Sequence, residues 1–506
     1  MYIFTDMTTK KVRTRFAPSP TGNLHIGGAR TALYAYLLAK KDGGAFVLRI
    51  EDTDRERSVE GSIQVIENGL RWLGIEWDEG IDNGGDFGPY LQSERQELYK
   101  THVDQLLESK KAYRCFCTSE RLDQMRSDQQ KNKQAPKYDR TCLALQPEDV
   151  EKKVNANESF VVRLLVPGQG SVVVHDLIRG DVSFDVKDID DQVLLKSDGF
   201  PTYHLANVVD DHLMEMTHVI RGEEWLPSTP KHVLLYKAFG WEAPAFAHLS
   251  LFLSKNGGKM SKRDGATSLL QFRDQGYLPA AVNNFIALLG WNPKTEEEFF
   301  TLDELVQKFD LSMVNKANAI FYTDKLDWMN QHYLRQLTAQ QMLEQMQSLV
   351  NVGGEHAAAY ERFIEWFSSL GAELQESIWN SAKERAKTLL EVAETAKLAV
   401  NEPSSYVAED LVWKKSDKET TIKILEKLLE YIDGTPAEEF LAKTLEEKTI
   451  AWISSTEWGN GDVLWPMRFA LSGERKSPSP FELAELLQKD ETIKRLQKAK
   501  QLLEEV

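Results

Sequence analysis

The segment Arg13–Gly28 contains residue types that could bind phosphate groups. Its first residues alternate like a strand, Pro18–Gly22 can continue neither a strand nor a helix, and helical spacing begins after His25. Backbone N–H groups at a helix N-terminus bind anions, and Gly27 and Gly28 carry no side chain that would keep a nucleotide away. His25 would donate a hydrogen bond beside such phosphates. An ordinary strand-to-helix turn shows the same pattern, so this segment alone leaves both interpretations open.

A second cluster of charge is Lys259-Met260-Ser261-Lys262-Arg263, which follows a predicted strand at Leu249–Leu253. Glycines on both sides of the cluster predict a loop. Lysine is a compact charge and arginine a planar fork, and both can neutralise charge that develops on transferring phosphoryl oxygens. The alternative interpretation is a solvated basic turn.

Polar residues also follow several strand-like runs. Glu51 follows the apolar run Phe46–Ile50, and the sequence pattern places Tyr203, Asn207 and Arg221 at the ends of similar runs. Ligands of open α/β sheets bind at the carboxyl ends of the strands. Glu51 could therefore meet an ammonium group or a ribose, and a pocket is predicted here. Surface or core residues without a function remain the alternative.

All three cysteines, Cys115, Cys117 and Cys142, fall within one short segment. Such clustering indicates a zinc site, which needs a fourth ligand. No histidine lies within a few residues after Cys142, and Tyr138 would be an unusual donor. Zinc ligands and buried thiols both remain possible from the spacing.

The composition is that of an ordinary globular protein with several domains. The 506 residues are too many for one core, and 42% are hydrophobic and 27% charged. No long uncharged apolar run predicts a membrane helix, and Met1–Lys10 lacks the apolar segment of a signal peptide, so a cytoplasmic location is expected. The net charge of −17 disfavours non-specific binding to nucleic acid but leaves room for a basic face.

The spacing of apolar residues predicts helices at either end of the chain. The first face comprises Ile26, Ala29, Leu33 and Leu37. From about residue 267 the pattern is predominantly helical. The helices expected there are Leu278–Leu289, Ala339–Val350, Ala358–Leu370, Ile378–Val400, Lys418–Ile432, Pro436–Trp452 and Pro480–Leu487. Between residues 113 and 190, short β-like runs indicate an insertion between two halves of a nucleotide-binding domain.

Taken together, the motifs resemble those of class I aminoacyl-tRNA synthetases, specifically the bacterial-type glutamyl-tRNA synthetases. His25-Ile26-Gly27-Gly28 and Lys259–Arg263 are similar to the two signatures of the class. The similarity to the glutamate subgroup rests on Phe16–Gly22, Arg49–Asp54, Tyr203–Asn207 and Leu464–Arg468, so it covers essentially the whole chain. Two positions depart from the pattern: Gly28 replaces the second His of the signature, and Ala144 replaces a His found near the cysteines of many relatives.

This resemblance implies the fold. We expect an α/β Rossmann-type parallel-sheet catalytic domain, an inserted α+β connective domain and an all-α C-terminal anticodon-binding region. The expected divisions are 1–112 for the first half of the catalytic domain, 113–191 for the inserted acceptor-binding domain, 192–265 for the second half, 266–330 for a stem-contact helical domain and 331–506 for the anticodon-binding region.

The resemblance also implies the reaction, in which glutamate attacks the ATP α-phosphate and the glutamyl group then passes to tRNA(Glu). The implied catalytic residues are His25, Lys259 and Lys262. The implied glutamate-binding residues are Arg15, Ala17, Ser19, Glu51, Tyr203, Asn207, Arg221 and Trp225. The implied ATP-binding residues are Pro18, Gly22, His25, Gly27, Gly28, Glu224, Lys259, Met260, Ser261, Lys262 and Arg263. Within the first set, Arg15 and Tyr203 would read the side-chain carboxylate, Glu51 the ammonium, and Arg221 with Asn207 the α-carboxylate.

Further partners follow from the same resemblance. Mg²⁺ would accompany ATP, and zinc, if bound, would be held by Cys115, Cys117, Tyr138 and Cys142. Arg385 is the candidate that distinguishes the last anticodon base of tRNA(Glu) from that of tRNA(Gln). The protein is expected to act as a monomer and not to associate with a membrane.

Several alternatives are weighed against this interpretation. Glutaminyl-tRNA synthetases usually carry a β-barrel anticodon domain, whereas residues 330–506 have a helical pattern. A truncated paralogue that modifies a tRNA base lacks an anticodon domain. A catalytically inactive tRNA-binding module is disfavoured by the presence of His25, Lys259 and Lys262. An enzyme that also charges tRNA(Gln) remains open.

Overall fold

The computed structural model describes residues 11–54, 57, 59–254, 258, 268–400, 403 and 407–505. Within these residues the chain forms two compact units, which we treat separately. One unit comprises the described part of Met1–Gln271 and Val282–Thr323, and the other comprises Phe272–Ala281 and the described part of Asp324–Val506. The motif Lys259–Arg263 lies outside the described residues.

A largely parallel sheet forms the centre of the first unit. Its strands are β1 (Arg13–Phe16), β2 (Ala45–Leu48), β5 (Ser171–Asp176), β6 (Gly180–Asp185), β8 (His218–Gly222) and β9 (Ala245–Leu249). β1 is parallel to β2, and β8 is parallel to β9. The amide of Thr217 donates to the carbonyl of Arg13 (3.0 Å), which joins the two pairs. β5 is parallel to β9 and antiparallel to β6, so the carboxyl ends of β1, β2, β8 and β9 share one edge.

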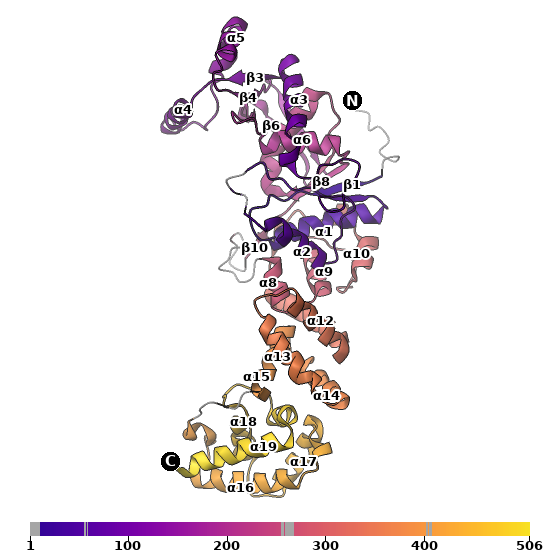
Figure 1. Ribbon diagram of the computed structural model, residues 1–506, viewed down its shortest axis with the longest axis vertical. Helices are drawn as coiled ribbons and strands as arrows, with labels where there is room; N and C mark the ends of the chain where they lie inside the picture. The colour runs from indigo at the N-terminus through magenta and orange to yellow at the C-terminus, as the bar shows by residue number, and fades with distance from the viewer. Residues whose placement is uncertain are drawn as a thin grey trace. The chain divides into compact units, whose positions relative to one another are not determined.

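Helices pack around this sheet. They are α1 (Ile26–Lys41), α2 (Ser62–Trp72), α3 (Gln96–Glu108), α6 (Tyr203–Leu213) and α7 (Thr229–Phe239). The predicted apolar face of α1 is completely buried, and Figure 1 shows this helix against β1. The helix begins at His25, whose Nδ1 accepts from the amide of Gly27 (3.4 Å). A left-handed Gly43 (φ +60°) follows its last turn, where the sequence predicts the end.

The inserted segment has its own small sheet. β3 (Ala112–Cys115), β4 (Val161–Leu164) and β7 (Val193–Leu195) are antiparallel, and helices α4 (Ser119–Lys131) and α5 (Pro147–Asn155) accompany them. Figure 1 shows both helices beside β3 and β4. This is the α+β insertion expected from the sequence.

Two local predictions in the first unit are wrong. Tyr203 and Asn207 lie on α6 instead of at the end of a strand, because Leu205, Val208 and Val209 repeat with helical spacing and are buried. The predicted strand Leu249–Leu253 is interrupted. The amide of Leu251 donates to side-chain oxygens of Glu223 and Asn318 (3.2 Å each), so β9 ends at Leu249 and β10 (Phe252–Leu253) pairs with β11 (Ala319–Ile320).

The remaining helices confirm the helical pattern of the second half of the chain. They are α8 (Leu269–Asp274), α9 (Pro279–Leu288), α10 (Leu302–Lys308), α11 (Thr323–Gln336), α12 (Ala339–Asn351), α13 (Ala357–Ser368), α14 (Ala372–Ala382), α15 (Leu389–Val400), α16 (Lys418–Gly434), α17 (Ala442–Ser454), α18 (Asn460–Ser472) and α19 (Pro480–Glu505). Among the described residues, no helix combines the length and the apolar composition that a membrane span requires.

The long helix predicted over Ile378–Val400 is in fact two helices, α14 and α15. Thr388 and Glu391 form a start signal for the second one: the Thr388 hydroxyl accepts from the amide of Glu391 (3.3 Å). The carboxylate of Glu391 accepts in turn from the amide of Lys387 (2.7 Å). Similarly, α19 continues beyond the predicted end at Leu487 after a kink at Gln488 (φ 59°).

Candidate active site

A cavity of about 670 Å³ opens at the carboxyl edge of the parallel strands in the first unit. It brings together every described residue that the resemblance assigns to glutamate or ATP. These are Arg15, Ala17, Pro18, Ser19, Gly22, His25, Gly27, Gly28, Glu51, Tyr203, Asn207, Arg221, Glu224 and Trp225. The roles given to them remain predictions, and Lys259, Met260, Ser261, Lys262 and Arg263 lie outside the described residues.

Strand pairing positions the first of these residues. Beyond the ends of β1 and β2, the parallel hydrogen bonds continue: the amide of Glu51 donates to the carbonyl of Pro18 (3.0 Å). The turn Pro18–Gly22 therefore passes directly beside the Glu51 carboxylate. Because Gly22 has a positive φ (129°), the chain can reverse here before α1 begins.

One wall of the cavity is the N-terminus of α1. Its first amides point out of the helix and carry the positive end of the helix dipole. Gly27 has no close side-chain neighbour, whereas a Cβ at Gly28 would lie 2.9 Å from Leu24 Cδ1. A larger residue at position 28 would thus displace Leu24, which gives a packing reason for the absence of the second signature His.

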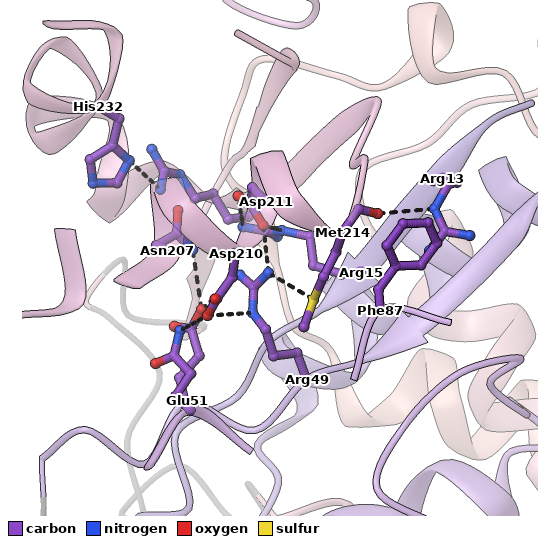
Figure 2. A network of polar contacts seen from close by, with 12 residues as sticks. Arg13, Arg15, Arg49, Glu51, Phe87, Asn207, Asp210, Asp211, Met214 and His232 are labelled. Carbon is purple, nitrogen blue, oxygen red and sulfur yellow. Dashed lines mark hydrogen bonds and ion pairs between the residues drawn. The ribbon is translucent and has the colours of Figure 1, made fainter. Parts of the chain in front are cut away.

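Beneath the cavity lies a buried cluster of charges, and Figure 2 labels five of its members, Arg15, Arg49, Glu51, Asp210 and Asp211. Its members are three arginines and three carboxylates, all at most 4% exposed: Arg15, Arg49, Arg95, Glu51, Asp210 and Asp211. Three positive and three negative charges cancel when all six groups are ionised. The cluster is therefore neutral as a whole, as a buried ionic network must nearly be.

Arg15 is bound into this cluster through Asp211. Its Nε donates to Asp211 Oδ1 (3.0 Å) and its Nη2 to Oδ2 (3.3 Å), while Arg49 Nη1 lies 2.8 Å from Asp211 Oδ1. Burial raises the pKa of Asp211, but Arg15 and Arg49 outweigh it and the net pKa lies below the ordinary value. Asp211 is therefore a carboxylate, and the charge of Arg15 already has a partner.

Glu51 is placed to bind a cation. Its Oε1 accepts from Arg49 Nη2 (3.0 Å) and from Asn207 Nδ2 (3.1 Å), the latter contact being visible in Figure 2. Burial raises the pKa of Glu51, and Arg49 and Arg15 act against this rise. Because both hydrogen bonds end on Oε1, Oε2 has no donor among the described residues and can accept from a ligand.

Arg221 differs from the arginines of the cluster because its partners carry no charge. Its donors reach four groups: His248 Nε2 (3.0 Å), Tyr203 Oη (3.1 Å), His232 Nδ1 (3.2 Å) and Thr229 Oγ1 (2.9 Å). A guanidinium has no acceptor, so both ring nitrogens that face it must be unprotonated. Burial is the main cause that lowers the pKa of both histidines, which keeps them neutral.

The guanidinium of Arg221 is thus a buried cation of this cavity whose partners are all neutral; among the described residues Arg30, also in the lining, donates only to the carbonyls of Leu289 and Ser250. Arg221 is 5% exposed, and in the part of the chain that the structure describes it forms no ion pair with a carboxylate. Four of its five N–H groups are used by the protein, which leaves one on Nη2. The ring of Tyr203 packs on Trp225 with centroids 4.4 Å apart, which holds its hydroxyl against Nη1 of the same guanidinium. This pair can bind one carboxylate.

The cysteine segment fits a metal ion. The three sulfurs of Cys115, Cys117 and Cys142 lie within 4.8 Å of one another, and those of Cys117 and Cys142 are 3.5 Å apart. A tetrahedral zinc with Zn–S bonds of about 2.3 Å gives a sulfur–sulfur distance of about 3.8 Å. The hydroxyl of Tyr138 is 3.4 Å from the sulfur of Cys117 and accepts from the amide of Cys142 (3.0 Å).

Arg385 lies in the second unit, in the connection between α14 and α15. Its side chain is 56% exposed and forms an ion pair with Glu482. The carboxylate of Glu482 also accepts from the hydroxyl of Ser381 (2.9 Å) and the amide of Ser479 (2.8 Å). The guanidinium is therefore held at the surface by an anchored acid.

Comparisons with known proteins point to a single family. Residues 11–328 match the family described as tRNA synthetases class I (E and Q), catalytic domain, and residues 357–500 match an anticodon binding domain. The chain is 42% identical over 488 residues to a glutamate–tRNA ligase of Dehalococcoides mccartyi, covering 96% of this chain and 97% of that protein. A glutamate–tRNA ligase of Moorella thermoacetica is also 42% identical, with 98% and 99% covered.

The chain belongs to the class I tRNA synthetases for glutamate and glutamine. Solved structures agree with this assignment. A glutamate–tRNA synthetase from Elizabethkingia anophelis superimposes with a TM-score of 0.81 at 38% identity, covering 97% of this chain and all of that one. A glutamate–tRNA ligase from Elizabethkingia meningosepticum, solved in complex with its amino acid, gives 0.81 at 39% identity, with 97% and 99% covered.

The family assignment confirms the resemblance and the fold class inferred from the sequence. The inactive tRNA-binding module and the enzyme that also charges tRNA(Gln) find no support in these comparisons. The curated relatives carry the name of the glutamate enzyme, not that of the glutamine enzyme.

Sequence reasoning missed the residues that set the charge and hydrogen bonding of this site. Asp211 and Arg49 belong to the buried ion cluster, and His232, His248 and Thr229 surround Arg221. Arg49 carried a readable signal, since a charged residue inside the apolar run Phe46–Ile50 must find a buried partner. His248 carried none, because its role depends on strands that meet only in the folded chain.

Proposed function

We infer that this protein ligates L-glutamate to tRNA(Glu) in an ATP-dependent reaction, through a glutamyl-adenylate. The observation that carries the substrate choice is the uncompensated charge of Arg221. Glutamate has two carboxylates and one ammonium group, and the cavity offers the buried cation of Arg221 to a carboxylate and the free Oε2 of Glu51 to the ammonium. Each kind of charged group on the substrate therefore has a partner of opposite charge.

In this arrangement Glu51 binds the ammonium through Oε2, and one carboxylate meets Arg221 and Tyr203. Asn207 and Arg15 lie beside the substrate, as do Ala17, Ser19 and Trp225. Arg15 retains one unused N–H on each terminal nitrogen, so it donates without supplying excess charge. Where Arg221 binds the side-chain carboxylate, glutamine, whose side chain is a neutral amide, would leave this cation buried and unpaired, which costs free energy and disfavours it.

For the nucleotide, we propose that the phosphates lie at the N-terminus of α1 with His25 beside them. The backbone of Pro18, Gly22, Gly27 and Gly28 then borders ATP, with Glu224 opposite. Lys259 and Lys262 are proposed to neutralise charge that develops on the α-phosphate during in-line attack, within the motif that ends at Arg263. Mg²⁺ bound with ATP supplies charge neutralisation at the phosphate oxygens.

Outside the cavity, we propose zinc at Cys115, Cys117, Tyr138 and Cys142, where it would hold the inserted segment together. Arg385 is the proposed reader of the last anticodon base. We also propose that the chain divides into five parts, with boundaries at residues 112, 191, 265 and 330. The protein is proposed to act as a monomer and to be located in the cytoplasm, where tRNA is charged.

Aminoacylation with purified tRNAs tests this function. The protein should attach radiolabelled glutamate to tRNA(Glu), should catalyse glutamate-dependent ATP–pyrophosphate exchange in the presence of that tRNA, and should use glutamine poorly. Exchange with glutamine as readily as with glutamate would refute the charge argument. Binding of tRNA without any exchange would refute ligase activity itself and favour the inactive module.

A further inference from the structure

A buried chain of hydrogen bonds leads from Arg221 to the end of β5 in the central sheet. Arg221 Nε donates to His248 Nε2 (3.0 Å), and the other ring nitrogen of His248, Nδ1, lies 2.6 Å from Asp176 Oδ2. Asp176 is the last residue of β5, and His248 lies on the adjacent strand β9. Both side chains are completely buried.

In this series of hydrogen bonds the position of each proton is defined. Since Arg221 can only donate, Nε2 of His248 must be bare, and the single ring proton then sits on Nδ1 and points at Asp176. Burial raises the pKa of Asp176, but hydrogen bonds from His248 and from backbone amides outweigh it and lower the net pKa, so Asp176 is a carboxylate. A carboxylate accepts only, which fixes this tautomer of His248.

We propose that Asp176 and His248 are positioning residues that hold the Arg221 guanidinium in the orientation that receives the carboxylate of the amino acid. This proposal rests on the glutamate function proposed above. It assigns a role in the binding step to β5, through a residue that does not line the cavity. The plane of a guanidinium is set by its Nε–H bond, so the acceptor at His248 Nε2 determines where the free Nη2–H points.

The substitution Asp176→Asn separates this role from simple packing. Asp176 Oδ1 accepts from the amides of Ile178 (2.9 Å) and Arg179 (2.7 Å), so the oxygen of an asparagine must stay there. Its NH₂ group then replaces Oδ2, so it donates toward His248 Nδ1 and no longer accepts from the backbone amide of His248 (3.1 Å to Oδ2). The proton of His248 moves to Nε2, where it opposes the Nε–H of Arg221.

A matched control exists on the same hairpin. His175 Nδ1 lies 2.7 Å from Asp181 Oδ1, the same type of pair, but the two side chains are 74% and 71% exposed. Asp181→Asn therefore makes the same chemical change without reaching Arg221.

Steady-state ATP–pyrophosphate exchange with the full-length enzyme provides the first test. We expect Asp176→Asn to raise KM for glutamate about tenfold, the value of a hydrogen bond to a charged group, without changing KM for ATP. Asp181→Asn should change neither. In a His248→Gln background, whose amide oxygen cannot change tautomer, Asp176→Asn should add no further effect. Equal effects of Asp176→Asn on both KM values, or the same loss in both backgrounds, would overturn the proposal.

NMR of ¹⁵N-histidine-labelled protein tests the arrangement independently of activity, with His248→Gln to assign the signal. The proton of His248 should reside on Nδ1 in the wild type and on Nε2 after Asp176→Asn. A wild-type protein with the proton on Nε2 overturns the positioning role. If this switch is seen but the wild type does not activate glutamate, the proposed function fails while the hydrogen-bond arrangement stands.

Discussion

Replacement of the buried cation Arg221 should weaken glutamate recognition strongly and should cost less stability than the breaking of a buried ion pair. In the variant Arg221→Gln the carboxylate of the substrate loses a charge-assisted hydrogen bond, worth about 1.5–3 kcal/mol. It also loses attraction to a buried charge, which at about 4 Å and an effective dielectric constant near 20 has an upper limit of about 4 kcal/mol. A loss of about 3–4 kcal/mol in kcat/KM for glutamate, between 100-fold and 1000-fold, is therefore expected, with KM for ATP unchanged.

The structure also predicts how this variant differs from its nearest equivalent, Arg15→Gln. All four partners of Arg221 are neutral, so its replacement leaves no unpaired charge behind, only buried acceptors that the two N–H groups of the glutamine amide can serve in part. Replacement of Arg15 leaves the ion cluster with a net charge of −1, since Asp211 keeps only Arg49. Breaking a buried ion pair in this way costs about 3–5 kcal/mol of unfolding free energy.

Two measurements on each purified variant decide between these outcomes. ATP–pyrophosphate exchange at varied glutamate gives kcat/KM, and urea unfolding gives the change in free energy. Arg221→Gln should lose activity and only a small part of the stability, while Arg15→Gln should lose much stability. If Arg221→Gln kept the wild-type KM for glutamate, or proved as unstable as Arg15→Gln, the charge balance described for this cavity would be refuted.

Three further predictions concern separate parts of the molecule. Burial lowers the pKa of His204 from 6.5 to about 4, so this side chain is neutral when folded and protonated when unfolded below pH 6.5. The unfolding free energy should therefore fall by up to about 3 kcal/mol as the pH decreases from 6.5 to 4, and calorimetry of His204→Gln should show a smaller fall. Purified protein should contain one zinc per chain by mass spectrometry of the metal, and Cys142→Ser should remove it, whereas zinc-free wild type would contradict the ligand set. Arg385→Gln should increase charging of tRNA(Gln) relative to tRNA(Glu) in a competition assay, and an unchanged ratio would exclude this residue as the discriminator.

The sequence predicts well those features that depend on neighbouring residues. The turn Pro18–Gly22, the start of α1 at His25 and its apolar face follow from proline and glycine chemistry and from helical spacing, and the structure has all three. Glu51 follows a strand in a parallel sheet, so its place at the ligand-binding edge could be predicted as well.

Predictions failed where a segment fits both strand and helix spacing, or where a capping pair starts a new helix inside a continuous apolar pattern. The run around Tyr203 is short enough to suit a strand, but Leu205, Val208 and Val209 bury one face of a helix. The break before α15 is encoded by Thr388 and Glu391, a capping pair that apolar spacing alone does not show.

The charge state of the site was decided by tertiary structure alone. The sequence supplies Arg15 and Arg221 as equivalent arginines in motifs of one family. Folding places Asp211, 196 positions from Arg15, against the first and surrounds the second with neutral histidines. Ion pairing acts over a few ångströms, so which arginine keeps a free charge depends on how α6, β8 and β9 meet. No local pattern carries that information, and the proposed preference for glutamate over glutamine rests on it.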